Sequence, residues 1–293
     1  DSIYNMVYRL DAMEAYNKRL VKKIAVKGIT ESGSTATDGF VYLESINLSK
    51  ADPTATIQFD CIGAKGLRKK TATVGIGYNL YDNSGESGKL DEYKEGFVVK
   101  SIDGRDNSVE FLNGIKIFAG DVIGKVSEDQ LRRIQIRETI LSHLERERQL
   151  FHKGIKVLSL FFIDEVAKYK QYDKAGHPFN GIYADMFEEE YNDILSSMQR
   201  EIGDEDYIRY LDAISAHDTH AGYFSVDKKG KMTDSKLSDK KEGTSDDIDA
   251  YDLIMKNKEL LLDRDPKKSP VRFIFSHSAL REGWDNPNVF QIC

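Results

Sequence analysis

The second half of the chain alternates short apolar runs with longer stretches in which apolar residues recur every three or four positions. The apolar runs lie at 156–163 and 271–276, and the helix-type stretches at 127–154, 183–198 and 248–262. A run that is apolar at successive positions suits a strand covered on both faces, as in a parallel sheet. Strands that alternate with helices therefore predict an α/β fold, a parallel sheet with flanking helices. Ser127, a capping-type residue, marks the start of the longest helix.

Residues 26–126 carry a different pattern, in which apolar residues alternate or cluster between turn signals. It predicts antiparallel strands at 40–46, 56–62, 73–81, 97–102, 109–112 and 115–118. Asn113-Gly114 separates the last two, and because both residues tolerate positive φ it predicts a two-residue hairpin. We therefore expect residues 26–126 to form a β-rich inserted domain. Residues 1–25 show helical spacing and are expected to form a helical lead-in packing on the α/β part.

Several classes of protein are excluded or disfavoured by what the chain lacks. No stretch approaches the roughly 18 apolar residues of a membrane span. Cys61 and Cys293 cannot build a disulfide scaffold, so we expect a reducing cytoplasm. None of the six histidines belongs to an HExxH motif, and His217 and His220 are expected in a loop, so we expect no metal site. Residues 119–125 (AGDVIGK) have phosphate-loop spacing, but Val126 follows in place of the serine or threonine that binds the metal.

The charge of the chain is unevenly distributed. The 42 basic and 49 acidic residues give a net charge of −7, which disfavours a nucleic-acid-binding protein. Residues 183–218, however, hold 11 acidic residues against Arg200 and Arg209, a net charge of −9 that leaves +2 for the rest. One acidic stretch thus makes the net charge of the whole chain negative. We interpret it as a solvated helix face, and an interface with another protein is the alternative.

The end of the chain carries the most informative segment, FIFSHSALREGWDNPNVFQIC at 273–293. An apolar strand runs into Ser276-His277-Ser278, a turn with Arg281 and Gly283 follows, and a second apolar strand comes after Asp285. Hydroxyl groups and a guanidinium at the carboxyl end of a parallel strand lie where open α/β sheets bind ligands.

This segment resembles motif V of superfamily 2 helicases, and SHSALREGWDNPNVFQI is more similar still to the restriction (Res) subunit of type III restriction-modification enzymes. VLSLFFIDEVAKY at 157–169 resembles motif IV of the same subunit. Asp164-Glu165 at the end of an apolar strand also fits a Walker B motif, which binds Mg²⁺. The likeness to motif IV replaces that interpretation. EAYNKRLVKKI at 14–24, HAGYFSVDKKGK at 220–231 and AYDLIMK at 250–256 are also similar to the family, in the same order.

The resemblance implies a role in a larger enzyme. Residues 127–293 would be a second RecA-like helicase lobe, truncated before motif VI. A first lobe, preceding Asp1, would supply most of the contacts to ATP and Mg²⁺. A nuclease domain would follow the second lobe. A methyltransferase (Mod) subunit and double-stranded DNA are the implied partners, in the cytoplasm of a bacterium.

The resemblance also implies roles for single residues. It assigns DNA contacts to Ser276, His277, Ser278 and Arg281, and nucleotide contacts to Gly283 and Asp285. It gives Phe161, Phe162 and Asp164 of motif IV a positioning role and implies no catalytic residue in this stretch. The alternatives are a non-enzymatic α/β protein-interaction module and a piece of another DNA-stimulated superfamily 2 ATPase.

Overall fold

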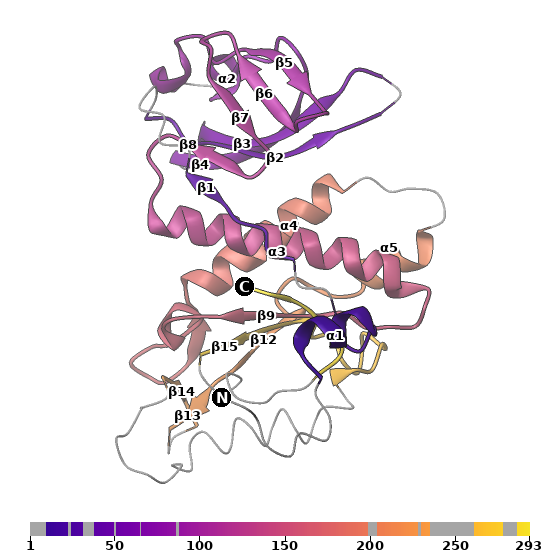
Figure 1. Cartoon of the computed structure of the whole chain (residues 1–293). Helices are drawn as coiled ribbons and strands as arrows, with labels where there is room; N and C mark the ends of the chain where they lie inside the picture. The colour runs from indigo at the N-terminus through magenta and orange to yellow at the C-terminus, as the bar shows by residue number, and fades with distance from the viewer. Residues whose placement is uncertain are drawn as a thin grey trace, which may run out of the picture. The chain divides into compact units, whose positions relative to one another are not determined.

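The computed structural model describes residues 10–22, 25–31, 38–49, 51–64, 66–85, 88–198, 204–227, 230–234, 261–277 and 286–293. The chain divides into two compact units, Asp1–Val126 and Ser127–Cys293. Figure 1 shows the helices and strands of both units. Within the described residues no helix combines the length and the apolar composition that a membrane span requires.

The first unit is built around two β-sheets. Five strands in the order β1-β8-β2-β3-β4 form the larger one: β1 (Thr30–Glu31), β2 (Val41–Asn47), β3 (Thr54–Gly63), β4 (Gly66–Val74) and β8 (Asp121–Ile123). The smaller sheet is β5 (Val99–Asp103), β6 (Ser108–Phe111) and β7 (Lys116–Phe118). The helical segments are α1 (Ala12–Asn17), α2 (Leu80–Asn83) and η1 (Asp91–Tyr93). Among the strands that the structure describes in this unit, every pair is antiparallel except β1 with β8.

A buried tyrosine organises the core of this unit. Tyr93 is fully buried and packs edge-on against Phe59, with ring centroids 6.0 Å apart. Its hydroxyl donates to the backbone oxygen of Phe40 at 2.6 Å and accepts from the backbone N–H of Asp60 at 2.9 Å. Because a buried hydroxyl needs a partner, these bonds fix the short η1 helix against the start of β2 and the middle of β3.

Two local predictions for this unit need correction. The strand expected at 73–81 is wrong beyond Val74, because Asn79 caps α2 by accepting the N–H groups of Tyr81 and Asp82. The hairpin at Asn113-Gly114 lies where expected, but only the glycine has positive φ, at 84°. Its N–H bonds to the oxygen of Phe111 at 3.0 Å, so the loop is longer than two residues.

The second unit is an α/β unit with a parallel sheet, as the sequence pattern predicts. Its sheet has the order β12-β15-β9-β16, from β9 (Leu158–Phe162), β12 (His220–Tyr223), β15 (Phe273–Ser276) and β16 (Val289–Ile292), all parallel. The helices are α3 (Glu128–Phe151), α4 (Ile182–Ser197), α5 (Glu205–Asp212) and η2 (Val166–Lys168). Its described part also holds two small antiparallel pairs, β10 (Lys170–Tyr172) with β11 (Pro178–Asn180) and β13 (Ser225–Val226) with β14 (Met232–Thr233).

Both faces of this sheet are covered, which explains why its strands are apolar at successive positions. Phe161, Phe273 and Phe275 point into a core shared with α3 and α4, which lie across one face in Figure 1. Leu160 and Ile274 pack on the other face against Leu261. The predicted α/β fold with an added antiparallel β-rich region is therefore confirmed. Residues 248–260 of the predicted helix 248–262 lie outside the described part of the chain.

The start and end of α3 follow from local sequence. Ser127 and Gln130 form a capping box, in which each side chain accepts the other residue's backbone N–H. Gly154, three residues beyond the helix, has a φ of 74°, which ends the helical path.

A buried ion pair crosses the core of the second unit. Arg272, directly before β15, is fully buried and donates to Glu147 of α3 at 2.6 Å. It also donates to the hydroxyls of Thr219 and of Tyr191 on α4. Tyr207 of α5 donates to the same Glu147 oxygen at 3.0 Å. Burial would raise the pKa of Glu147, but Arg272 and the neighbouring donors bring it down to about 2.

We predict that Arg272→Met destabilises the chain by about 3–5 kcal/mol, because it leaves the buried Glu147 carboxylate unpaired. Urea unfolding measures the change. Arg209→Met is the matched control, since Arg209 pairs with Asp206 at an exposed site and is worth at most about 1 kcal/mol. Equal losses in the two variants would contradict the role assigned to the pair.

Candidate functional site

The carboxyl ends of two neighbouring strands meet at one edge of the parallel sheet. Ser276 closes β15 opposite Phe162, the last residue of β9, and the Ile163 N–H bonds to the Ser276 oxygen at 2.9 Å. His277 follows β15 directly, and Asp164 lies two residues beyond the end of β9. We refer to residues 162–164 and 276–277 as the carboxyl edge, the part of an open α/β sheet where ligands bind.

Ser276 and His277 place polar atoms inside this edge. Ser276 is fully buried. Neither its Oγ nor the buried Nδ1 of His277 has a hydrogen-bond partner among the residues that the structure describes. Buried polar atoms are nearly always paired in folded proteins, so these two mark a place where a polar partner is expected.

Four of the residues assigned by resemblance lie outside the described part of the chain. They are Ser278, Arg281, Gly283 and Asp285. The second apolar strand expected after them is β16, which runs parallel to β9. Asn288, just before β16, donates from its side chain to the Lys156 oxygen at 2.7 Å, so the chain has returned to the amino end of the sheet.

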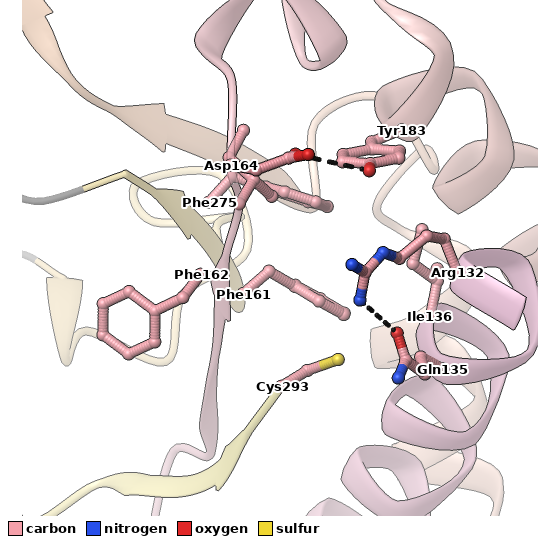
Figure 2. Close-up of a pocket in the computed structure, with 10 residues that line it drawn as sticks. Arg132, Gln135, Ile136, Phe161, Phe162, Asp164, Tyr183, Phe275 and Cys293 are labelled. Carbon is pink, nitrogen blue, oxygen red and sulfur yellow. Dashed lines mark hydrogen bonds between the residues drawn. The ribbon is translucent and has the colours of Figure 1, made fainter. Parts of the chain in front are cut away.

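The two motif IV phenylalanines point to opposite faces of β9 (Figure 2). Phe161 is buried, stacks on Phe275 with centroids 4.6 Å apart and packs edge-on against Phe187 of α4. Phe162 is only half-buried and packs on the opposite core. The structure thus makes Phe161 the residue that holds the strand end against the helices.

Asp164 is held by its own neighbours. It accepts from Lys168 at 2.5 Å and from the hydroxyl of Tyr183 at 3.4 Å. Burial works against the charged form, but the Lys168 bond prevails and the pKa of Asp164 is lowered. Asp164 is therefore an anion with Lys168 and Tyr183 as partners. Its positioning role stays a prediction.

A pocket of about 320 Å³ opens beside the carboxyl edge, between β9 and α3. Its floor is apolar, and polar groups of Arg132, Gln135, Asp164 and Tyr183 surround it (Figure 2). The lining is Arg132, Gln135, Ile136, Phe161, Phe162, Ile163, Asp164, Tyr183, Phe275 and Cys293. Sequence reasoning missed Arg132, Gln135 and Tyr183, because only the packing of α3 and α4 brings them to the strand ends.

The acidic stretch 183–218 is not simply a solvated face. Glu190 of α4 is buried and accepts from Arg137 at 2.7 Å and from Arg133 at 2.9 Å, both on α3. Burial and this double pairing correct the interpretation at that position, since a charge leaves water only when it is paired. Helix α5, with further acidic residues, bonds through Tyr207 to Glu147, so it lies at the amino end of β15 and away from Ser276.

We predict that Phe161→Ala costs about 3–5 kcal/mol of unfolding free energy, because it removes a ring buried among aromatic neighbours. Phe162→Ala, at the adjacent half-buried position, should cost at most about 2 kcal/mol. Urea unfolding of the two variants compares them directly. A larger loss for Phe162→Ala would contradict the assignment of the two faces.

Comparison with known proteins agrees with the resemblance. The chain is 33% identical over 299 residues to the EcoP15I Res subunit of Escherichia coli, which covers 99% of this chain and 26% of that protein. It is 38% identical over 196 residues to the EcoPI Res subunit of Escherichia phage P1, covering 64% of this chain and 18% of that protein. The StyLTI Res subunit of Salmonella typhimurium is 28% identical to the chain over 308 residues, covering 97% of this chain and 27% of that protein.

No family model matches the chain, and no solved structure matches it. The chain spans about a quarter of the length of the curated relatives that it matches over nearly its whole length. Three named relatives of one kind nevertheless align with it, so the predicted resemblance is confirmed: this is a Res-like sequence, similar to the Res subunits of type III restriction-modification enzymes.

Proposed function

We propose that this chain is part of the ATP-driven motor of a type III restriction-modification enzyme, with residues 127–293 as its second RecA-like lobe. The observation that carries the proposal is the alignment with Res subunits over 97–99% of the chain in two cases. The parallel sheet supports it, because the strands of motifs IV and V, β9 and β15, are direct neighbours.

Contact with DNA is assigned to the carboxyl edge and the segment that follows it. The unpaired atoms of Ser276 and His277 among the described residues support a polar ligand here. Ser278 and Arg281 come next in the chain and would add a hydroxyl and a guanidinium. Such groups bind phosphate oxygens, and these contacts hold a DNA backbone without reading its sequence.

Contact with the nucleotide is assigned to Gly283 and Asp285. A glycine lets the backbone approach a ligand closely, and a carboxylate can accept hydrogen bonds from a ribose hydroxyl. ATP with Mg²⁺ would supply the energy of the motor and would be held mainly by a first lobe. By itself the present chain is expected to show neither ATPase nor nuclease activity.

The two kinds of contact would be coupled through motion of the lobes. If nucleotide binding draws two lobes together, the contacts between the carboxyl edge and the DNA change in strength with each cycle of ATP binding and hydrolysis. Phe161 and Asp164 would keep the edge in a fixed geometry while this happens. Double-stranded DNA and a Mod subunit complete the proposed enzyme, and restriction of DNA is its proposed role.

The charge distribution of the second unit is compatible with this assignment. Arg133 and Arg137 of α3 neutralise part of the acidic stretch, and α5 lies at the amino end of β15. This arrangement weakens the alternative of a protein-binding module that uses residues 183–218 as one continuous acidic interface.

We predict that the 293-residue chain binds duplex DNA with an affinity that falls as salt rises. Arg281→Ala should reduce the slope of log K against log salt by about one, the value for one lost phosphate contact. Arg209→Ala on α5 removes the same charge from the other end of the sheet and should leave the slope unchanged. Fluorescence anisotropy at several salt concentrations measures both.

Two results would contradict the DNA assignment. One is binding that does not depend on salt. The other is an equal effect of Arg281→Ala and Arg209→Ala, which would mean that only total charge matters.

A further inference from the structure

Three side chains from two segments that are far apart in the sequence meet on the outside of the second unit. Glu188 lies in the middle of α4, His217 lies in the turn before β12, and His220 is the first residue of that strand. Glu188 Oε1 is 2.9 Å from His217 Nδ1 and 3.3 Å from His220 Nε2. One donor atom from each residue lies within 4.8 Å of the other two.

More polar groups surround one Glu188 oxygen than that oxygen has lone pairs. Glu188 Oε1 faces the two imidazole nitrogens and also accepts from the Asn180 side chain at 2.8 Å. A carboxylate oxygen has two lone pairs, so when both imidazole nitrogens carry a proton, three donors compete for two lone pairs. A cation between Glu188, His217 and His220 would take one lone pair and leave the other for Asn180.

The spacing suits a transition metal. Bonds of about 2.0–2.2 Å in a tetrahedral zinc site put neighbouring ligand atoms roughly 3.3–3.5 Å apart. The two distances from Glu188 need only small adjustments to reach this range. His217 makes the remaining adjustment easily, because 63% of its side chain is exposed to solvent.

The buried ligand is already oriented by a second partner. His220, with only 2% of its side chain exposed, has its Nδ1 2.9 Å from the Tyr169 hydroxyl. That contact leaves Nε2 directed at Glu188. A partner on the second ring nitrogen is the usual way in which proteins fix a metal-binding histidine.

The turn that carries both histidines is also fixed. The backbone N–H of Asp218 bonds to Ser215 Oγ at 3.1 Å, and the Ser215 hydroxyl donates to the Asp218 carboxylate. The hydroxyl of the buried Thr219 accepts a hydrogen bond from Arg272 Nε at 3.0 Å. The backbone that carries the two histidines is thereby attached to the ion pair in the core.

We propose that Glu188, His217 and His220 bind one divalent transition-metal ion, with Zn²⁺ as the preferred ion. Two histidines and one carboxylate are a common donor set for Zn²⁺. The ion would join α4 to the start of β12 and stabilise the side of the sheet away from the carboxyl edge. Exposure of His217 leaves the fourth position to water. The proposal reverses our expectation of no metal site.

Cobalt titration of the chelator-treated 293-residue chain tests the proposal. We expect one equivalent of Co²⁺ to bind with the strong visible absorption of a four-coordinate ion, and Zn²⁺ to displace it. His217→Ala and Glu188→Gln should each weaken binding at least about tenfold, since even partners outside the ligand set are worth that much. Zn²⁺ should raise the melting temperature of the wild-type chain.

His177→Ala is the matched control. His177 is an exposed histidine 3.2 Å from the Asp173 carboxylate, and among the described residues no third ligand joins that pair. This variant should bind Co²⁺ as the wild type does. The proposal is overturned if Co²⁺ shows only the weak absorption of a six-coordinate ion. It is equally overturned if His177→Ala loses as much affinity as His217→Ala, or if the two ligand variants lose none.

Discussion

The ion pair between Arg272 and Glu147 is the interaction on which the second unit depends. It joins the start of β15 to α3, and its partners Tyr191, Tyr207 and Thr219 add α4, α5 and the turn before β12. Two charges in an apolar core are costly unless they are paired with each other, so this arrangement tolerates little displacement. It sets the position of β15 at its amino end, and the strand carries that position through to Ser276 at its carboxyl end.

The two ends of the parallel sheet therefore differ in their proposed roles: ligand contact at the carboxyl edge and stabilisation at the amino end. At the carboxyl edge, the buried polar atoms of Ser276 and His277 and the pocket beside β9 lie where β15 and β9 end. At the amino end, the helices are tied by ion pairs and by the tyrosine hydroxyls. The histidine turn, bonded to Arg272 through Thr219, links the proposed metal site to the same framework. Stability and ligand contact are thus separated along the strands, as is common in α/β proteins.

The sequence predicts the features that depend on neighbouring residues. The Ser127 cap starts α3 where expected, the apolar runs at 156–163 and 271–276 contain β9 and β15, and the apolar strand expected after Asp285 is β16. Where a local signal competes with another, the prediction fails. The alternating run at 73–81 is overridden by Gly77 and the Asn79 cap, which turn the chain into α2.

Features that arise from packing could not be predicted. Nothing near Arg272 in the sequence indicates Glu147, 125 residues away, as its partner. The same holds for Glu188 beside His217 and for Arg132 in the pocket. The interpretation of Glu190 as solvated fails for this reason, since α3 supplies its arginines. The strand pattern indicates a ligand site at the end of β15, but the DNA and nucleotide roles of single residues rest on the resemblance. Residues 278–285 lie outside the described part of the chain.

Hydrogen–deuterium exchange of the 293-residue chain with and without duplex DNA tests most directly the claim that the carboxyl edge contacts nucleic acid. Contact slows exchange by restricting local opening of the backbone. The account predicts slower exchange in peptides covering 160–168 and 274–285, and no change in α5. Protection of α5 with unchanged exchange at the carboxyl edge would contradict it.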